Sequence, residues 1–353
     1  MSNGFWEKLP RPIMALAPMA DVTDAPFRRI IAKYSKWGGS DIGDGSKANL
    51  PDEVFRAGGP DVMFTEFVSA DGLFLSPPKA RTKLMKELVF SEAERPIVAQ
   101  FFTAKPEMMR RASRLAQELG FDGVDINMGC PDRSVEKQGA GAGLIKTPSL
   151  AVEIILSAKE GAGNLPISVK TRLGYNKDEL ETWLPALLSA KPSAITIHAR
   201  TRKEMSEVPA RWDRVTRAVE IRDSLKSQTL ILGNGDVLDI LDGGLKAKES
   251  GADGAMLGRA IFGNPWLFSN SHELENRKLE ETIATKLKVL VEHAKLFEKL
   301  LGEVKNFAVM KKHFKAYVSG WDGAKDLRMR LMETKDSFEV EEVVMSYLKT
   351  LKK

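Results

Sequence analysis

Eight short apolar segments constrain the fold of this chain more than any other feature. Each is followed by turn residues and then by a stretch with apolar residues at helical spacing, and the pattern runs from about Pro12 to Phe268. Eight strand and helix pairs favour a closed barrel over an open sheet. The expected fold class is therefore α/β, a (β/α)8 TIM barrel, with strands at residues 14–17, 62–65, 97–100, 123–127, 167–170, 194–198, 229–232 and 254–257.

The alternation stops after residues 263–266, and the remaining sequence predicts only helices, at residues 279–301, 307–318, 324–332 and 338–351. We therefore predict a barrel domain over residues 1–270 and a small all-helical C-terminal domain over residues 271–353. Residues 35–60, rich in Gly, Asp and Ser, predict a long insertion with one helical turn near residues 52–56. A surface loop is the simple interpretation of this insertion, and a lid that contacts substrate is the alternative.

Composition narrows the class of protein. No window holds the roughly 18 consecutive apolar residues of a membrane span, and the first residues do not resemble a secretory signal. One cysteine excludes an internal disulfide, so we expect a reducing cytoplasm. The net charge of +5 is compatible with a polyanionic partner, but many enzymes of small molecules are equally basic. The tail segment 310–317 mixes cations with aromatic residues, as RNA-binding surfaces do, although a solvated helix face is the simpler interpretation.

The one cysteine, Cys130, lies just past the predicted fourth strand, in a glycine-rich segment with the sequence DINMGCPDRSVEKQGAGAG at residues 125–143. Catalytic groups of such barrels lie at the carboxyl ends of the strands, so a thiol there is a candidate reactive group. The alternative is a small buried thiol that only packs. The glycines favour the reactive role, because they allow the backbone to approach a ligand closely.

Polar residues follow most of the other predicted strands. A buried strand that ends in Lys, Gln or His is unfavourable unless the polar group finds a partner, so a shared polar ligand is expected at this rim. A salt bridge within the rim is the alternative for Lys170, and a structural role is the alternative for His198. The residues at or just after these strand ends, polar for the most part, are Pro18, Met19, Gln100, Asn127, Lys170, Arg172, His198, Arg200, Asn234, Gly258 and Arg259.

Two late segments predict a phosphate site. The sequence GNGD at residues 233–236 follows the seventh strand, and LGRA at residues 257–260 follows the eighth, where barrels commonly bind phosphate. HExxH, paired CxxC, GxSxG and Walker sequences are all missing, so metal-dependent, hydrolytic and phosphoryl-transfer functions are disfavoured. We expect no dedicated metal site.

Six motifs in this order resemble those of the tRNA-dihydrouridine synthases, and the resemblance spans nearly the whole chain. They are APM and DVTD at residues 17–24, NMGCP at 127–131, VKTRLG at 169–174, HARTR at 198–202, NGD at 234–236 and GR at 258–259. The tail adds KKH at residues 311–313 and LRMR at 327–330.

The resemblance implies an FMN-containing barrel that reduces the C5–C6 double bond of particular tRNA uridines to dihydrouridine, after NADPH has reduced the flavin. It makes Cys130 the general acid that protonates C5 while flavin N5 delivers hydride to C6. A target uracil must leave its stack in the RNA before it can reach the flavin. The resemblance also implies a cytoplasmic enzyme with tRNA as its partner, and we expect a monomer that binds neither membrane nor metal.

The resemblance assigns further roles by position. Contacts to the isoalloxazine and ribityl groups fall to Pro18, Met19, Gln100, Lys170 and His198, and those to the rest of the cofactor, chiefly its phosphate, to Asn234, Gly235, Asp236, Gly258 and Arg259. Asn127, Arg172 and Arg200 would bind the substrate base and its surroundings, and Lys311, Lys312 and Arg328 would bind tRNA.

Two departures from the family pattern concern RNA binding more than the flavin. The insertion at residues 35–60 is longer than expected, and we expect it to shape how tRNA docks; residues 203–212 lack an expected Gln and Tyr. One rival function is an FMN barrel that acts on a free pyrimidine, of the dihydroorotate or dihydropyrimidine dehydrogenase type. Another is a non-catalytic RNA-binding protein, which the joint presence of Cys130, Lys170 and Arg259 disfavours.

Overall fold

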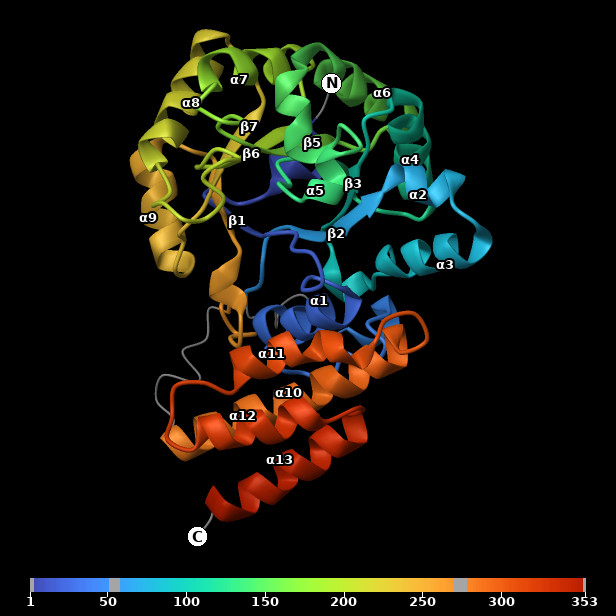
Figure 1. Cartoon of the computed structure of the whole chain (residues 1–353). Helices are drawn as coiled ribbons and strands as arrows, with labels where there is room; N and C mark the ends of the chain where they lie inside the picture. Colours follow the sequence, from blue (N-terminus) through green and yellow to red (C-terminus); the bar gives the residue numbers. More distant parts are fainter. Residues whose placement is uncertain (1–2, 51–57, 270–277, 352–353) are drawn as a thin grey trace. The chain divides into compact units, whose positions relative to one another are not determined.

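Eight parallel strands form the sheet of this protein in the computed structural model, which describes residues 3–50, 58–269 and 278–351 (Figure 1). The strands pair in the order β1-β8-β7-β6-β5-β4-β3-β2. Their bounds are β1 Ile13–Leu16, β2 Met63–Ser69, β3 Ile97–Phe102, β4 Gly123–Met128, β5 Ile167–Arg172, β6 Ala194–His198, β7 Leu230–Asn234 and β8 Gly254–Leu257. All eight predicted strands are confirmed to within a few residues.

The sheet closes between its first strand and the residues that lead into its second. Leu16 N donates to Val62 O (3.0 Å) and Asp61 N donates to Met14 O (2.8 Å). Ala15 and Val62 form a parallel bridge. The predicted TIM-barrel fold is therefore confirmed.

Helices follow the strands around the barrel, and strand alternation decides which side chains face them. Trp183 of α7 donates its indole N–H to Thr171 Oγ1 of β5 at 2.9 Å, so Thr171 points toward the helices. Lys170 and Arg172, its neighbours in the strand, point the other way, into the barrel. The helices of this part are α2 Ala70–Leu75, α3 Pro78–Glu87, α4 Pro106–Glu118, α5 Arg133–Glu136, α6 Pro148–Ala162, α7 Leu180–Ser189, α8 Trp212–Ser224 and α9 Ile240–Ser250, with 3-10 turns η1 Gly4–Lys8 and η6 Gly141–Lys146.

The chain divides into two compact units. The barrel unit comprises Met1–Ala20, Pro60–Leu88 and Arg95–Gly258, and the helical unit comprises Asp21–Gly59, Val89–Glu94 and Arg259–Lys353. The helices of the second unit are α1 Ala25–Ile31, α10 Leu279–Leu301, α11 Met310–Tyr317, α12 Ala324–Glu333 and α13 Ser337–Leu351, with short turns η2 Ala32–Lys36, η3 Lys47–Asn49, η5 Glu92–Glu94, η7 Arg259–Ile261 and η8 Phe307–Val309. The predicted tail helices are confirmed.

The helical unit includes α1, which the sequence places in the domain of residues 1–270. The reason is apolar packing, because Ile30 of α1 belongs to one buried cluster with Leu287, Phe297 and Phe314. Polar contacts support this packing, since Lys33 Nζ lies 2.7 Å from Glu292 Oε1 and the Tyr34 hydroxyl donates to Glu292 Oε2 at 2.6 Å.

The described part of the 35–60 insertion packs into the helical unit. Trp37 and Ile42 are buried, and Ala93 N donates to Gly45 O at 3.3 Å. A Cβ on Gly45 would lie 2.6 Å from Ser91 Oγ, so this close approach requires glycine. The helical turn predicted near residues 52–56 lies outside the described residues.

Two buried histidines of the helical unit predict a stability that depends on pH. The rings of His293 and His313 lie 4.6 Å apart beside Phe27 and Tyr317, and no described residue bonds either ring nitrogen of His293 or Nε2 of His313. Burial lowers the pKa of His313 to about 3 and places the pKa of His293 well below its usual value.

The unfolded chain therefore binds protons on these histidines below pH ~6.5, where the folded chain does not, so stability should fall as the pH falls from that value. At pH 5 the loss is roughly 2 kcal/mol per histidine. Urea unfolding of the wild type and of the His293→Phe/His313→Phe variant at pH 7.5 and 5.0 measures it. Equal losses in both proteins would contradict the assignment, because the variant retains every other titrating group.

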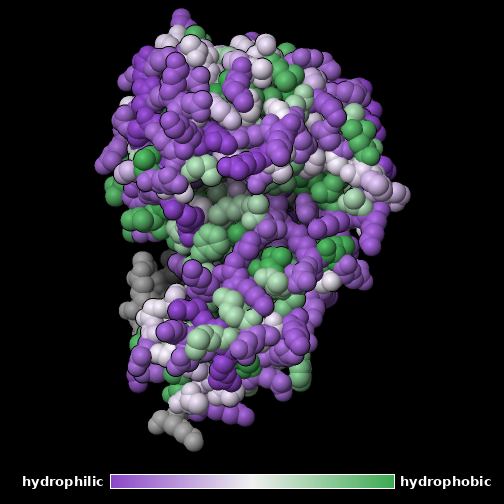
Figure 2. Space-filling model, in the orientation of Figure 1, coloured by the Kyte–Doolittle hydropathy of each residue, from purple (hydrophilic) through white to green (hydrophobic). Residues whose placement is uncertain are grey.

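Among the described residues, no helix is long and apolar enough to cross a membrane. In the view of Figure 2 the surface is largely hydrophilic, with hydrophobic residues in small scattered groups.

Candidate active site

Cys130 lies two residues beyond the end of β4, on a loop that several bonds hold. Asn127 Oδ1 accepts from the backbone N–H of Gly129 (3.1 Å) and of Cys130 (2.9 Å), and Cys130 O accepts from Ala142 N (2.9 Å). A Cβ on Gly141, which has φ +58°, would lie 2.7 Å from Cys130 O, so the return of the chain requires glycine there.

The partly buried Cys130 packs against the apolar cluster of Phe102, Val135 and Ala140. This burial raises the pKa of the thiol, while a hydrogen bond from the Asp132 backbone and the cations of Arg172 and Lys170 oppose the rise. The thiol is neither sealed in the core nor activated as a thiolate. It is a partly accessible group that keeps its proton at neutral pH, which is the state that a general acid needs.

Strand register places the predicted polar residues side by side. Asn127 pairs with Lys170, and His198 pairs with Arg172 on one side and with Asn234 on the other. Lys170 Nζ donates to Asn234 Oδ1 at 3.2 Å, and Asn234 Nδ2 donates to Met256 O at 2.8 Å. Burial is the main cause that lowers the pKa of Lys170 to about 8, with the Arg172 charge next. Lys170 is thus a cation inside the barrel, and its ammonium group is held by the Asn234 amide.

Arg172 is committed to the loops around the site. Its Nε donates to Gly129 O (2.8 Å), and its Nη1 donates to Thr201 O (3.0 Å) and Met205 O (2.9 Å). Burial lowers the pKa of Arg172 to about 10. The family resemblance assigns Arg172 to the substrate. In the structure its bonds also hold the Cys130 loop next to residues 201–205.

His198 and Arg200 form a second polar group with Asp236. Arg200 Nη1 lies 3.1 Å from His198 Nε2, Arg200 Nη2 lies 2.5 Å from Asp236 Oδ2, and Arg200 Nε donates to Val208 O at 2.5 Å. Arg200 is 2% exposed, so its guanidinium group contacts His198 but is little accessible to a ligand. Asp236 also accepts from Ala210 N at 2.9 Å, so its carboxylate is directed to Arg200 and this loop.

The fold itself requires glycine just after β7 but not just after β8. Gly235 has φ +119°, and its Cβ would lie 2.9 Å from Ala210 Cβ, so the chain itself requires glycine there. Gly258 has no positive φ, and its Cβ would meet nothing nearer than Ala17 Cβ and Met19 Sδ at 3.7 Å. The fold does not need glycine at this position. Pro18 is buried beside Met19, and Arg259 is exposed at the start of η7.

Asp125 was missed as a site residue by sequence reasoning. It is 1% exposed, and its carboxylate accepts from Ser168 Oγ (2.6 Å) and Gln100 Nε2 (2.6 Å). Burial raises its pKa to about 6, against the lowering effect of these two hydrogen bonds and of the Lys170 charge. The signal was present in the sequence, because Asp125 precedes Asn127 by two residues and so shares its face of β4.

The three tail residues assigned to tRNA lie in the helical unit. Lys311 and Lys312 belong to α11, and Lys312 Nζ lies 3.5 Å from Asp21 Oδ2 with 40% of its side chain exposed. Arg328 of α12 donates from Nη1 to Val318 O at 2.8 Å, close to the end of α11. Arg328 therefore also joins two helices, and Lys312 is the more available cation.

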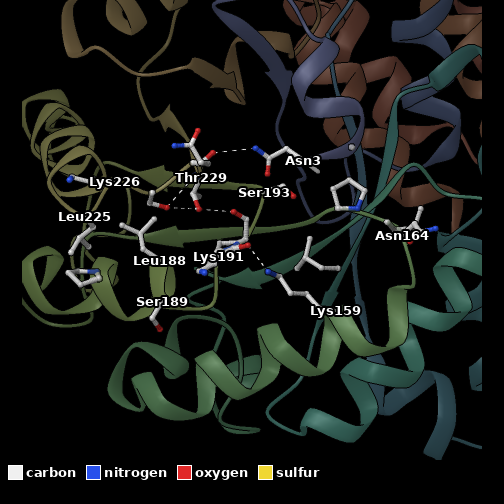
Figure 3. A pocket seen from close by; sticks show the side chains of 18 of the residues that line it. Asn3, Lys159, Asn164, Leu188, Ser189, Lys191, Ser193, Leu225, Lys226 and Thr229 are labelled. Carbon is white, nitrogen blue, oxygen red and sulfur yellow. Dashed lines mark hydrogen bonds between the residues drawn. The ribbon is translucent and has the colours of Figure 1, made fainter. Parts of the chain in front are cut away.

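A groove of about 1050 Å³ lies at the amino ends of the strands, away from Cys130. Lys159, Lys191, Ser193 and Thr229 are among the residues that line it (Figure 3). Lys159 Nζ donates to the carbonyls of Ala190 (2.7 Å) and Lys191 (2.6 Å). None of the predicted site residues is among the described residues that line it. Over the described ranges, no group of three His, Cys, Asp or Glu side chains is placed to bind a metal ion.

Comparison with known proteins identifies the class to which this barrel belongs. Residues 15–352 match the family described as dihydrouridine synthase (Dus). A protein of Staphylococcus aureus (strain MRSA252) named "Probable tRNA-dihydrouridine synthase" is 39% identical over 341 residues, which cover 96% of this chain and 94% of that protein. "Probable tRNA-dihydrouridine synthase 2" of Bacillus subtilis (strain 168) is 39% identical over 342 residues, with 96% and 95% covered.

The chain thus belongs to the dihydrouridine synthase family, and it is a flavin-dependent oxidoreductase. The resemblance noted from the sequence motifs is confirmed. The individual roles assigned to its site residues stay predictions.

Proposed function

We propose that this protein reduces uridines of tRNA to 5,6-dihydrouridine, with FMN as the bound flavin, NADPH as the reductant and Cys130 as the proton donor. The names of its relatives support the substrate. The observation that carries the proposal is the position of the one thiol of the chain, partly accessible and protonated, beyond β4 and beside the row of Asn127, Lys170, His198 and Asn234.

The residues present fit a flavin. An isoalloxazine ring presents carbonyl oxygens and ring nitrogens along one edge, and Lys170 and His198 are donors of matching chemistry inside the barrel. Gln100 is 0% exposed and bonds Asp125 and Asn127, so its predicted contact with the flavin is not supported by its surroundings. Gly258 leaves a space that the packing of the chain does not use, at the end of the last strand, where barrels bind phosphate. Arg259, next in the chain, supplies the cation for that phosphate.

When bound and reduced, the flavin supplies a hydride to C6 of the uracil ring. The residues of the chain provide the rest. Asn127 and the backbone of its loop hold Cys130, and the raised pKa of the thiol keeps the proton that C5 must receive. Lys170, held by Asn234, would offer a positive charge to the bound flavin.

The substrate is tested by comparison. Purified protein should reduce unmodified tRNA with NADPH, and it should act on uracil or orotate at least about a hundredfold more slowly, because binding energy from the remote parts of tRNA is lost with the free base. Dihydrouridine formation is measured by mass spectrometry of digested tRNA. Faster turnover of a free pyrimidine would replace the proposal with the dehydrogenase alternative, and a colourless protein without flavin would leave only RNA binding.

Gly258→Ala should lower the affinity for FMN by about tenfold or more, because the methyl group occupies space that the phosphate needs. Stability without flavin should change by less than about 0.5 kcal/mol, since the added Cβ contacts nothing closer than 3.7 Å. Fluorescence titration of the apoprotein with FMN, together with urea unfolding, measures both quantities.

Gly235→Ala is the matched control, since its Cβ would lie 2.9 Å from Ala210 Cβ on a backbone that disfavours alanine. That variant should lose stability as well as flavin. Unchanged FMN affinity in Gly258→Ala would place the phosphate elsewhere.

A further inference from the structure

A continuous chain of hydrogen bonds connects a buried carboxylate to the loop of Cys130. Asp125 Oδ2 accepts from Gln100 Nε2 (2.6 Å), and Gln100 Oε1 accepts from Asn127 Nδ2 (3.1 Å). Asn127 Oδ1 then accepts from the backbone N–H groups of Gly129 (3.1 Å) and Cys130 (2.9 Å). The second oxygen of Asp125 accepts from Ser168 Oγ at 2.6 Å. The chain crosses from β4 to β3, returns to β4 and ends at the thiol-bearing residue.

The chemistry of its two ends makes this chain directional. A backbone N–H can only donate, so the oxygen of Asn127 faces Gly129 and Cys130, and its NH2 group faces Gln100. Gln100 must then present its oxygen to Asn127 and its NH2 group to Asp125, which accepts because an ionised carboxylate has no proton to donate. Neither amide can turn over alone without setting donor against donor.

The three side chains of this hydrogen-bond chain are buried, so a wrong amide orientation could not be compensated by water. Gln100 is 0%, Asp125 1% and Asn127 6% exposed, so water has little access with which to replace a lost partner. Other bonds also hold the loop beyond Asn127: Thr171 donates to Met128 O, Arg172 to Gly129 O and Ala142 to Cys130 O, and the backbone N–H of Asp132 bonds the thiol. An error in the orientation of the Asn127 amide would still be passed to the backbone of Cys130, through the bonds that Asn127 Oδ1 accepts.

We propose that Asp125 is a positioning residue, whose carboxylate fixes the orientations of the Gln100 and Asn127 amides and through them the placement of the Cys130 thiol. The inference rests on the proposed function, since the position of the thiol matters for catalysis only if Cys130 donates the proton. Asp125 itself touches no reacting atom in this scheme. Its charge also faces Lys170, so the test must separate orientation from charge.

The experiment compares a single, a double and a triple variant at residues 168, 125 and 100. Ser168→Ala is the control, because it removes one donor to Asp125 and leaves the bond to Gln100. In Ser168→Ala/Asp125→Leu the carboxylate is gone, so the Gln100 NH2 group loses its acceptor, and only the two backbone N–H groups still orient the Asn127 amide. In the triple variant, which adds Gln100→Glu, the new carboxylate is an acceptor that faces Asn127. It also replaces the negative charge lost at residue 125 with one at residue 100.

Alkylation by iodoacetamide is the readout, since Cys130 is the one cysteine of the 353 residues. The pH profile of the rate separates the pKa of the thiol from the plateau rate of the thiolate, which reports its placement. The plateau of Ser168→Ala should stay within about twofold of the wild type, that of the double variant should rise by about fivefold or more, and the triple variant should return toward the control.

The inference would be overturned if the double variant had the plateau rate of Ser168→Ala, or if the triple variant did not recover that rate. If only the thiol pKa changed, Asp125 would act on Cys130 through its charge and not through the amide orientations. Labelling needs neither tRNA nor NADPH, so it is independent of the proposed function. If the plateau changes as expected but uridine turnover does not fall by about tenfold in the double variant, the acid role of Cys130 fails and the positioning stands. If the double variant does not fold, neutron diffraction of the wild type decides, because amides found in the opposite orientation would refute the scheme.

Discussion

Replacing Cys130 with alanine should lower the rate of uridine reduction by about a thousandfold, within the range that a positioned general acid contributes. The methyl group still packs against the cluster of Phe102, Val135 and Ala140 but has no proton to give. Flavin content and the rate of flavin reduction by NADPH should stay within about twofold of the wild type, because neither uses the thiol in the proposed mechanism. Single-turnover kinetics with pre-reduced protein and tRNA isolates the affected step.

Ser134→Ala is the control for this variant, since Ser134 lies in α5, four residues beyond Cys130, with an exposed hydroxyl bonded to Asp132. It should turn over tRNA like the wild type. A Cys130→Ala protein that keeps more than about a tenth of its activity would refute the proton-donor role.

Removing the carboxylate of Glu94 should destabilise the helical unit by about 3–5 kcal/mol, because a fully buried cation would lose its partner. Arg28 Nε lies 2.6 Å from Glu94 Oε2, and both side chains are 0% exposed. The remaining donors of Arg28 bond the carbonyls of Thr23 (2.7 Å) and Val89 (2.6 Å), and Glu94 Oε1 accepts from Ser91 N (2.8 Å). Urea unfolding of Glu94→Leu measures the loss.

The double variant Arg28→Met/Glu94→Leu is its control, since it removes both charges together. It should recover most of the stability lost in Glu94→Leu, because replacing a whole buried ion pair by apolar residues is often neutral. A single variant as stable as the wild type would show that solvent reaches the site and replaces the carboxylate.

The strands and tail helices could be predicted from the sequence because each leaves a local pattern. The run at residues 194–198 is bounded by turn residues and matches β6 Ala194–His198, and the helical spacing at residues 279–301 matches α10 Leu279–Leu301. The partner of an apolar face leaves no such pattern. Ile30 lies on an amphipathic helix early in the chain, and its spacing does not indicate that its face packs with Leu287 and Phe314.

The site shows the same distinction between position and partner. Parallel register brings the residues after successive strands together, so Lys170, His198 and Asn234 could be placed at one rim from their positions alone. The partners of long side chains could not be placed, because they depend on loops whose paths the sequence does not specify. Arg172 and Arg200 bond such loops in addition to any substrate role, and Asp125 became a site residue only through its bonds to Gln100 and Ser168.

The clustering of α1 with helices from the far end of the chain has a consequence for synthesis. Residues 25–31 leave the ribosome long before α10 and α11 exist, and at cellular translation rates the wait is on the order of ten seconds or more. Ile30 and its apolar neighbours stay without their native cover during that interval. A nascent chain stalled before residue 279 should therefore bind a ribosome-associated chaperone, and release of the full-length chain should end that binding.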